Sequence, residues 1–377
     1  MESFTVSAEV HVVLSAGEGL EELLLEPSGR GPVQVVRAGD FVLSTDGRAV
    51  RELIVEGTSR LGGVSFQGRS YPGRIRVLPR SAGGLRLINE IDLESYVEGV
   101  VAAELPLWSA EPAELRAQAI AVRTYALHTL GQRMLERGSS GTFLWDSVED
   151  QAYRGRYEPP RTNRGEVAAA ERLGEAVRAT RGQVLSRDGR LVDARFHAAC
   201  GGRTSDLAEI FPGAHDTSEG VECEPCRRRS AAGEHEDASN GPPIHWKHTF
   251  DGPSLDQAAM KLGVGKKLLS CEPARTDTAG RWIEVSITGP EGSMVLGQEM
   301  FRRTLGFTTM KSTLVEGQWP PAGQAITGGL MLRGRGRGHG VGLCQEGARG
   351  YARMGWLAGD ILRHYYTDTT IERLPAF

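Results

Sequence analysis

The chain has 377 residues, enough for two domains or for one large elaborated domain, and 40% of them are apolar. The formal net charge of −4 does not favour a nucleic-acid partner. The sequence has no run of about 18 apolar residues, so it predicts no transmembrane helix. The N-terminus lacks the basic region and apolar core of a signal peptide. Two explanations stay open: a cytoplasmic protein, or an exported protein whose signal has been removed.

The first 90 residues predict a β-rich portion. Short alternating runs at 10–14, 34–37 and 74–78 are separated by turn pairs that contain glycine. The 49 glycines of the chain also favour many turns and short strands over a helical bundle. Residues 91–377 are expected to form the catalytic core, with a polar, loop-like insertion at about 212–243.

Several helices are predicted after residue 104. Ser109 and Pro112 are helix-start signals, and apolar residues then recur at steps of three and four. A second helix is predicted over roughly 163–181, followed by a hairpin that turns at 188–189. The later predicted elements are a strand at 282–287, a short helix at 297–306, a glycine-rich strand and turn at 328–342, and helical pieces at 345–355 and 360–366. Strands and helices mix without regular alternation, which favours an α+β fold of small mixed sheets with a few helices around a central cleft.

Glu104 is the candidate catalytic residue. It lies between small apolar residues and the sequence Leu-Pro-Leu-Trp, where a carboxylate is poorly solvated. Poor solvation raises the pKa of a carboxyl group, which can then serve as a general acid. Trp108 and Tyr125 offer aromatic surfaces of the kind that stack on sugar rings, and Arg123 can bind a hydroxyl or carboxylate. The alternatives are that Glu104 is a solvated residue at the end of an element, and that Arg123 forms a buried pair with an acid such as Glu98 or Glu104.

The glycine-rich block at 334–350, GRGRGHGVGLCQEGARG, is a second candidate element. It lacks the Lys-Ser/Thr ending of a phosphate loop and the strand–helix–strand context of a dinucleotide site, so nucleotide binding is not favoured. His339 lies between two glycines, which permits close approach of a ligand. Gln345 is expected to open a helix whose free N–H groups can meet a polar ligand. A glycine-dense packing element is the alternative.

The cysteines predict a structural zinc site. Their number is odd and their spacing uneven, which argues against a disulfide scaffold. Cys223 and Cys226 form a C-x-x-C pair that can bind one zinc ion, and His197 with Cys200 completes a tetrahedral set if the chain bends there. Such a set looks closed, which disfavours a catalytic zinc hydrolase.

Other arrangements of these residues stay open. A Cys200–Cys223 or Cys223–Cys226 disulfide would suit an exported protein, and free thiols are a further alternative. Cys271 and Cys344 are expected to be isolated thiols. The other histidines that can supply the fourth zinc ligand are His215, His235, His245 and His248.

The sequence resembles the SpoIID/LytB domain family, the stage II sporulation protein D group, from about residue 8 to residue 373. A C-terminal segment that begins at Asp360 also fits. The three matching blocks are YVEGVVAAELPLWSAEPAELRAQAIAVRTYAL (96–127), FHAACGGRTSDLAEIF (196–211) and GRGRGHGVGLCQEGARGYARMGW (334–356).

The resemblance implies a role for four residues, because the better-studied members are lytic transglycosylases that act on peptidoglycan. Glu104 matches the catalytic glutamate of the family, and Arg123 matches the arginine of its helix. His339 and Gln345 match its glycine-rich cleft element. Segment 145–153 contains no cysteine or histidine, so the zinc site that some relatives carry there is expected to be absent.

The expected function is cleavage of the β-1,4 bond between N-acetylmuramic acid and N-acetylglucosamine, with a 1,6-anhydro product. One carboxylate suffices for this reaction, unlike the usual pair of a hydrolase. The alternative is a non-catalytic cell-wall module that enhances a partner amidase, as the LytB branch implies. Peptidoglycan glycan strands and a cell-wall amidase are the expected partners, catalysis needs no cofactor, and the resemblance implies a location outside the cytoplasm, in the cell wall or an intermembrane space.

Overall fold

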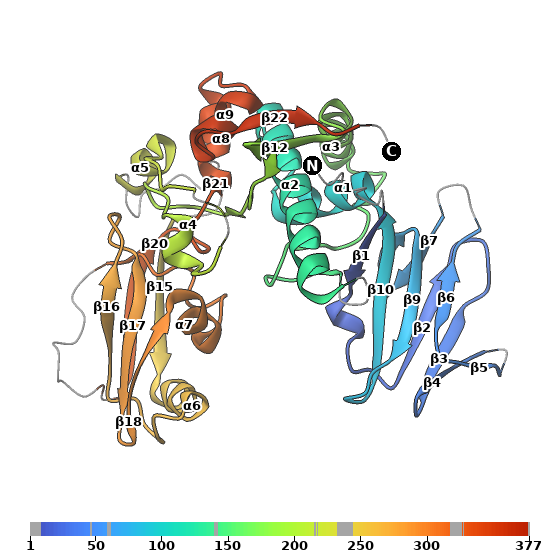
Figure 1. Ribbon diagram of the computed structural model, residues 1–377, viewed down its shortest axis with the longest axis horizontal. Helices are drawn as coiled ribbons and strands as arrows, with labels where there is room; N and C mark the ends of the chain where they lie inside the picture. Colours follow the sequence, from blue (N-terminus) through green and yellow to red (C-terminus); the bar gives the residue numbers. More distant parts are fainter. Residues whose placement is uncertain are drawn as a thin grey trace. The chain divides into compact units, whose positions relative to one another are not determined.

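The computed structural model describes residues 9–375 except 46, 59–61, 139–141, 215, 217, 232–243, 317–325 and 327. The chain divides into two compact units, which we call the first unit (Met1–Val192 with Ile371–Phe377) and the second unit (Asp193–Thr370). Both units mix helices with small sheets, so the predicted α+β class is confirmed (Figure 1). The division lies after Val192, whereas the sequence predicted a boundary near residue 90.

Two mainly antiparallel sheets form the N-terminal β portion of the first unit. A five-stranded sheet has the order β11-β1-β10-β9-β6, and a six-stranded sheet has the order β5-β4-β3-β2-β7-β8. The bounds of the first sheet are β1 (Glu9–Val13), β6 (Leu53–Glu56), β9 (Arg74–Pro79), β10 (Leu85–Asp92) and β11 (Leu144–Trp145). Those of the second are β2 (Glu22–Pro27), β3 (Val33–Ala38), β4 (Phe41–Ser44), β5 (Ala49–Val50), β7 (Gly63–Phe66) and β8 (Arg69–Pro72), and a 3-10 turn η1 (Ser15–Gly17) follows β1.

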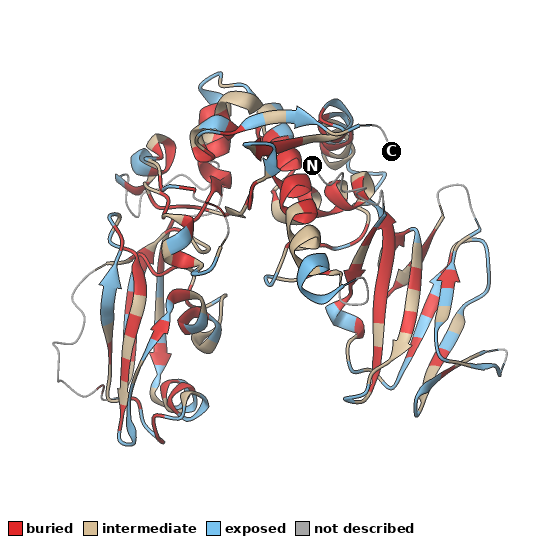
Figure 2. Cartoon of the chain, viewed as in Figure 1, coloured by how far each residue is buried: buried red, intermediate tan, exposed pale blue. Residues whose placement is uncertain are grey.

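The five-stranded sheet leads directly into the helices of the first unit. Its central strand β10 is buried along most of its length (Figure 2) and continues into α1 (Leu93–Glu104), where the Asp92 side chain accepts the Ser95 N–H. Helix α2 (Pro112–Arg137) packs against α1, α3 (Arg164–Ala179) and β12 (Gln183–Arg187). A three-stranded sheet, β13 (Arg190–Leu191), β12 and β22 (Thr370–Arg373), completes the unit. Helices α2 and α3 were predicted, but α1 was not.

The second unit contains three small sheets. The sheet orders are β15-β20-β19, β16-β17-β18 and β14-β21. Their strands are β14 (Phe196–His197), β15 (His245–Asp251), β16 (Ser270–Thr276), β17 (Trp282–Gly289), β18 (Gly292–Gly297), β19 (Val315–Glu316), β20 (Gly329–Arg335) and β21 (Leu343–Cys344). The predicted strand at 282–287 is β17, whose alternate side chains are buried in a core with Trp246 and Phe301.

Short helices close the second unit. They are α4 (Leu207–Ile210), α5 (Glu224–Ala231), α6 (Gly252–Leu262), α7 (Gln298–Leu305), α8 (Gln345–Arg353) and α9 (Ala358–Tyr365). The predicted helices at 297–306, 345–355 and 360–366 correspond to α7, α8 and α9. The predicted loop at 212–243 contains α5, and the rest of its second half lies outside the described residues. Among the described residues, no helix combines the length and apolar character that crossing a bilayer requires.

Candidate functional site

Glu104 is the last residue of α1, at the start of the turn that joins α1 to α2. Its side chain is half-buried, and Oε1 accepts a hydrogen bond of 2.9 Å from the backbone N–H of Ala152. A residue 48 positions away in the sequence therefore orients this carboxylate. Because Glu104 keeps part of its surface open to solvent, a ligand can reach it.

Side-chain hydrogen bonds anchor segment 145–153, which holds Glu104 through the Ala152 N–H. Arg133 donates two hydrogen bonds to the buried Asp150 carboxylate, at 2.7 and 2.8 Å, and the Tyr125 hydroxyl donates a third at 3.2 Å. Gln151 Oε1 accepts the Tyr96 hydroxyl at 2.9 Å. Burial, together with the charge of Asp150, raises the pKa of Tyr96 well above its usual value, so Tyr96 stays a hydrogen-bond donor.

Apart from Tyr125, the sequence did not single out these anchoring residues. Segment 145–153 was noted only because it lacks the cysteines and histidines of some relatives. Asp150 also accepts the Trp145 N–H at 2.7 Å, which adds a further hydrogen bond within this segment. The run of polar residues at 146–151 was the signal that could have pointed to it.

The two predicted aromatic residues lie in different settings. Trp108 is on the turn after α1 with 64% of its surface exposed, which leaves its ring face open. Tyr125 is buried, and its hydroxyl is engaged with Asp150. Trp108 is thus the accessible aromatic surface, while Tyr125 supports the segment that orients Glu104.

Arg123 is fully buried and holds secondary structure elements together. Its Nε and Nη2 donate to the two Glu94 oxygens at 3.0 and 2.6 Å, and Nη1 donates to the Gln183 carbonyl at 2.9 Å. These contacts connect α2 to α1 and to β12. The structure does not support the predicted substrate contact of Arg123, because no part of the side chain reaches solvent. The buried pair was one of the sequence alternatives, with Glu94 as the acid rather than Glu98 or Glu104.

The other carboxylate of α1, Glu98, is half-buried, and burial raises its pKa despite the lowering influence of Arg156 and Arg178. Glu104 lies six positions after Glu98, which places the two residues about 120° apart around the helix. The two carboxylates therefore lie on different faces of α1.

The glycine-rich block of the second unit is a packing element around two buried side chains. Gly336, Gly338, Gly340 and Gly342 all have positive φ angles, between 70° and 94°. A Cβ atom on Gly338 would lie 2.8 Å from His197 Cβ, and one on Gly340 would lie 2.5 Å from Arg281 Nε. Only glycine fits both the backbone conformation and the close approach.

His339 is half-buried, and Gln345 is buried. His339 Nδ1 accepts the Val341 N–H at 3.0 Å, and its ring lies 5.3 Å from Phe211 and 5.5 Å from His197 between centroids. Burial, with the charges of His197 and Arg195, lowers the pKa of His339 well below its usual value, so the ring is neutral. Gln345 is the first residue of α8 and is buried. Their predicted role as substrate contacts stays a prediction.

Four cysteines of the second unit come together: Cys200, Cys223, Cys226 and Cys344. All four are buried and unbridged, and their sulfur atoms lie within 4.8 Å of one another. The predicted ligand set is corrected at one position. His197 is outside the cluster, because β14 points its ring toward the glycine block, where Nδ1 bonds with the Val341 carbonyl at 2.9 Å.

Cys344 was expected to be isolated but takes the fourth place in this cysteine cluster. Parallel pairing of β14 with β21 aligns His197 with Cys344, and the Cys200 N–H points at Cys344 Sγ at 3.3 Å. Of the alternative histidine ligands, His245 contacts the Ser230 carbonyl and His248 packs on Phe250. His215 and His235 lie outside the described residues.

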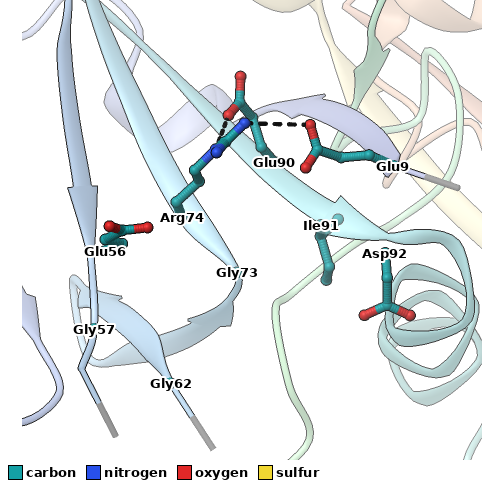
Figure 3. Close-up of a pocket in the computed structure, with 9 residues that line it drawn as sticks. All are labelled: Glu9, Glu56, Gly57, Gly62, Gly73, Arg74, Glu90, Ile91 and Asp92. Atoms are coloured by element: carbon teal, nitrogen blue, oxygen red, sulfur yellow. Dashed lines mark hydrogen bonds and ion pairs between the residues drawn. The ribbon is translucent and has the colours of Figure 1, made fainter. Parts of the chain in front are cut away.

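A polar pocket in the first unit is lined by Glu9, Arg74, Glu90 and Asp92 among others (Figure 3). Glu9, His11 and Glu90 are close enough to share a cation. However, Arg74 and Arg76 already form ion pairs with the buried Glu90 carboxylate. Two guanidinium groups satisfy the charge of this carboxylate, so the pocket does not favour a metal ion.

The comparisons with known proteins converge on one family. A family model described as stage II sporulation protein, SpoIID, matches residues 81–186, which include Glu104 and the segment that orients it. The stage II sporulation protein D of Bacillus subtilis is 27% identical over 292 residues, which cover 77% of each chain. The chain is therefore similar to the SpoIID family, both in this segment and over most of its length.

Two further similar proteins come from the same bacterial genus. The stage II sporulation protein D of Bacillus amyloliquefaciens is 27% identical over 294 residues, again 77% of each chain. A protein named amidase enhancer from Bacillus subtilis is 26% identical over 325 residues, which cover 73% of this chain and 40% of that protein. The predicted family resemblance is thereby confirmed.

Proposed function

We propose that this protein is a peptidoglycan lytic transglycosylase in which Glu104 is the single acid–base residue. The observation that carries the proposal is a half-exposed carboxylate at the end of α1 whose Oε1 is held by the Ala152 N–H. Similarity to the SpoIID family supports the coarser statement that the protein has a cell-wall-related role.

The reaction needs one proton donor that becomes a proton acceptor. The protonated Glu104 carboxyl donates its proton to the glycosidic oxygen, and the bond between that oxygen and C1 of N-acetylmuramic acid breaks. The 6-hydroxyl of the same sugar then attacks C1, and its proton passes to the Glu104 carboxylate. The products are a free 4-hydroxyl on N-acetylglucosamine and a 1,6-anhydro ring, with no water consumed and the enzyme returned to its protonated form.

The position of Glu104 suits both protonation states. The C-terminal end of a helix carries the negative end of the helix dipole, which disfavours a charged carboxylate. The Ala152 N–H stabilises the ionised form instead. These opposed influences support a group that alternates between acid and base.

No second carboxylate on α1 is placed to assist. Glu94 is committed to Arg123, and Glu98 lies on another face of the helix. A hydrolase needs a second carboxylate to activate water or to form a covalent intermediate, whereas an internal 6-hydroxyl makes that group unnecessary. The exposed ring of Trp108, four residues after Glu104, is a surface on which a sugar ring can stack.

The test is Glu104→Gln, with Glu98→Gln as the matched control on the same helix. Glycan strands are incubated with each protein, and anhydromuramyl ends are quantified by mass spectrometry. We expect Glu104→Gln to lower the rate by about 10²–10⁴-fold, the usual contribution of a general acid–base group, while Glu98→Gln stays close to wild type. Circular dichroism shows whether both variants are folded. A folded Glu104→Gln protein with full activity would refute the assignment.

A second candidate function is enhancement of a cell-wall amidase without glycan cleavage. The similarity to a protein named amidase enhancer favours it. The same assay separates the two functions. Unchanged glycan strands, together with a faster amidase reaction that Glu104→Gln leaves intact, would support the enhancer and contradict the transglycosylase.

A further inference from the structure

We propose that Cys200, Cys223, Cys226 and Cys344 bind one zinc ion that stabilises the second unit. The four sulfur atoms lie within 4.8 Å of one another, and Cys226 Sγ is 3.4 Å from Cys344 Sγ. Zinc–sulfur bonds of about 2.3 Å at tetrahedral angles separate the sulfurs by about 3.8 Å. The cysteine cluster therefore has the size of a shell around a single tetrahedral ion.

The separation of the sulfurs distinguishes a metal site from disulfides. A disulfide needs an S–S distance of about 2.05 Å, far below the 3.4 Å between Cys226 and Cys344. Two disulfides would also divide the four sulfurs into two bonded pairs, whereas here all four are mutual neighbours. A polynuclear iron–sulfur cluster would hold its cysteines farther apart, because several iron atoms lie between the thiolates.

Two tight turns present three of the four ligands. Gly202 N–H points at Cys200 Sγ at 3.4 Å, which curls the chain around this sulfur. The Cys223 N–H donates to the Gly202 carbonyl at 2.8 Å, so the turn that contains Cys200 and the C-x-x-C turn are joined. The fourth ligand, Cys344, immediately precedes α8, and its Sγ accepts the Gly347 N–H at 3.3 Å.

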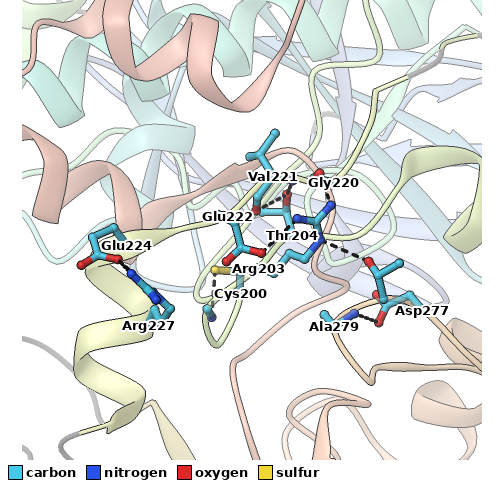
Figure 4. Close-up of polar contacts among 12 residues, drawn as sticks. Cys200, Arg203, Thr204, Gly220, Val221, Glu222, Glu224, Arg227, Asp277 and Ala279 are labelled. Atoms are coloured by element: carbon cyan, nitrogen blue, oxygen red, sulfur yellow. Dashed lines mark hydrogen bonds and ion pairs between the residues drawn. The ribbon is translucent and has the colours of Figure 1, made fainter.

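Polar contacts outside the sulfurs hold these turns side by side. An antiparallel bridge pairs Arg203 with Glu222, the residues next to the two turns. The Arg203 guanidinium adds hydrogen bonds to the Glu222 carboxylate at 3.0 Å and to the Gly220 carbonyl at 2.8 Å (Figure 4). Thr204 and Val221 bond reciprocally in the next step of this bridge. The ligands are therefore positioned by surrounding structure and not only by the ion.

Neighbouring groups also suit a negatively charged metal–thiolate centre. The Tyr365 hydroxyl lies 3.1 Å from Cys223 Sγ and can donate to it. Buried Arg281 donates to the Cys200 carbonyl at 2.9 Å, which places a positive charge beside the site. Such hydrogen bonds from outside the ligand shell orient the ligands of protein metal sites.

The ligand set specifies a structural rather than a catalytic role. Each thiol loses its proton to solvent on binding, and four thiolates fill the tetrahedral shell of Zn²⁺ without an open position for water or substrate. The bound ion would connect the turn after β14, the start of α5 and the start of α8. These segments are far apart in the sequence, so metal loss should loosen the second unit.

The experiment measures metal content and zinc-dependent stability of the full chain purified under reducing conditions with zinc in the medium. We expect about one zinc per chain in the wild type and less than about a tenth of that in Cys344→Ser. Cobalt substitution should give the visible absorption of a tetrahedral thiolate site. Removal of zinc by a chelator should lower the melting temperature of the wild type, and this readout does not require that any variant folds.

Two matched variants separate this site from the alternatives. Cys271→Ala changes the other buried free cysteine of the second unit, which packs in a different core, and should retain zinc. His197→Gln should also retain zinc, because the imidazole lies outside the cysteine cluster. Loss of zinc in His197→Gln would overturn the four-cysteine set. A wild type that binds no zinc, or one whose cysteines are recovered as disulfides from the reduced preparation, would overturn the site itself.

Discussion

Replacement of Arg123 by methionine tests whether this arginine stabilises the first unit or binds substrate. Methionine keeps an unbranched side chain of similar length but removes the charge and the donors to Glu94 and to the Gln183 carbonyl. The remaining Glu94 carboxylate would keep its hydrogen bond from the Gly182 N–H at 3.2 Å. Its side chain is only 15% exposed, so water can compensate the lost partner only in part.

The expected loss of stability is large. Breaking a buried ion pair by removing one partner typically costs about 3–5 kcal/mol. For a unit of roughly 200 residues, each kcal/mol lowers the melting temperature by about 2–4 °C, so Arg123→Met should lower it by about 6–20 °C. The double variant Arg123→Met with Glu94→Gln should recover part of the loss, because it leaves no buried unpaired charge.

Urea unfolding of each variant, monitored by circular dichroism, measures the free energy of unfolding. Glycan binding is measured separately on the folded protein. Arg116→Met is the matched control, since Arg116 lies two turns earlier on α2 and is exposed. We expect it to change stability by less than about 0.5 kcal/mol. If Arg123→Met were as stable as Arg116→Met but lost glycan binding, the structural role would be wrong and the substrate contact right.

Two further predictions concern the first unit. Asp150→Asn should reduce the proposed transglycosylase activity and leave glycan binding at the proposed Trp108 surface largely intact, because Asp150 anchors the segment that orients Glu104. Rates and dissociation constants measured separately check this, and an equal loss of both would contradict it. Burial raises the pKa of Glu90, but the hydrogen bond from Arg74 and the charges of Arg76 and Arg74 together outweigh it, so the net pKa is lowered. Because the pKa is lowered in the folded protein, the stabilisation by Glu90 is complete above about pH 4.3 and is lost as the pH falls further. The difference in the free energy of unfolding between wild type and Glu90→Gln, measured in urea, should therefore shrink between pH 7 and pH 3. A constant difference would refute this prediction.

The sequence predicted those elements whose local signals agree with their tertiary surroundings. Helix α2 has a capping pair, Glu111 with Glu114, and a continuous apolar stripe, so its local signals favour the same structure as its packing. Helix α1 was missed because it is short, contains several valines and has a glycine at position 99. A Cβ atom at Gly99 would collide with the Tyr153 ring and the Gly155 carbonyl, so close packing explains a residue that weakens the helix locally.

The same difference between local sequence signals and tertiary contacts applies to the residues of the two candidate sites. The residue types of Glu104 and of the C-x-x-C pair carry chemistry that is readable without a fold, because acidity and thiolate affinity belong to the side chains. Their partners are not readable in this way. Ala152 reaches Glu104 through its backbone N–H, which every residue type except proline provides, and Cys344 joins Cys200 only because β14 pairs with β21.

The sequence by itself therefore determined the family resemblance, the fold class and the residue types on which the two proposals rest. Only the tertiary structure decided that Arg123 is buried with Glu94 and that Cys344, not His197, completes the cysteine cluster. The physical reason is that burial and ion pairing depend on contacts between segments up to about 140 residues apart, and no local pattern records which segments meet.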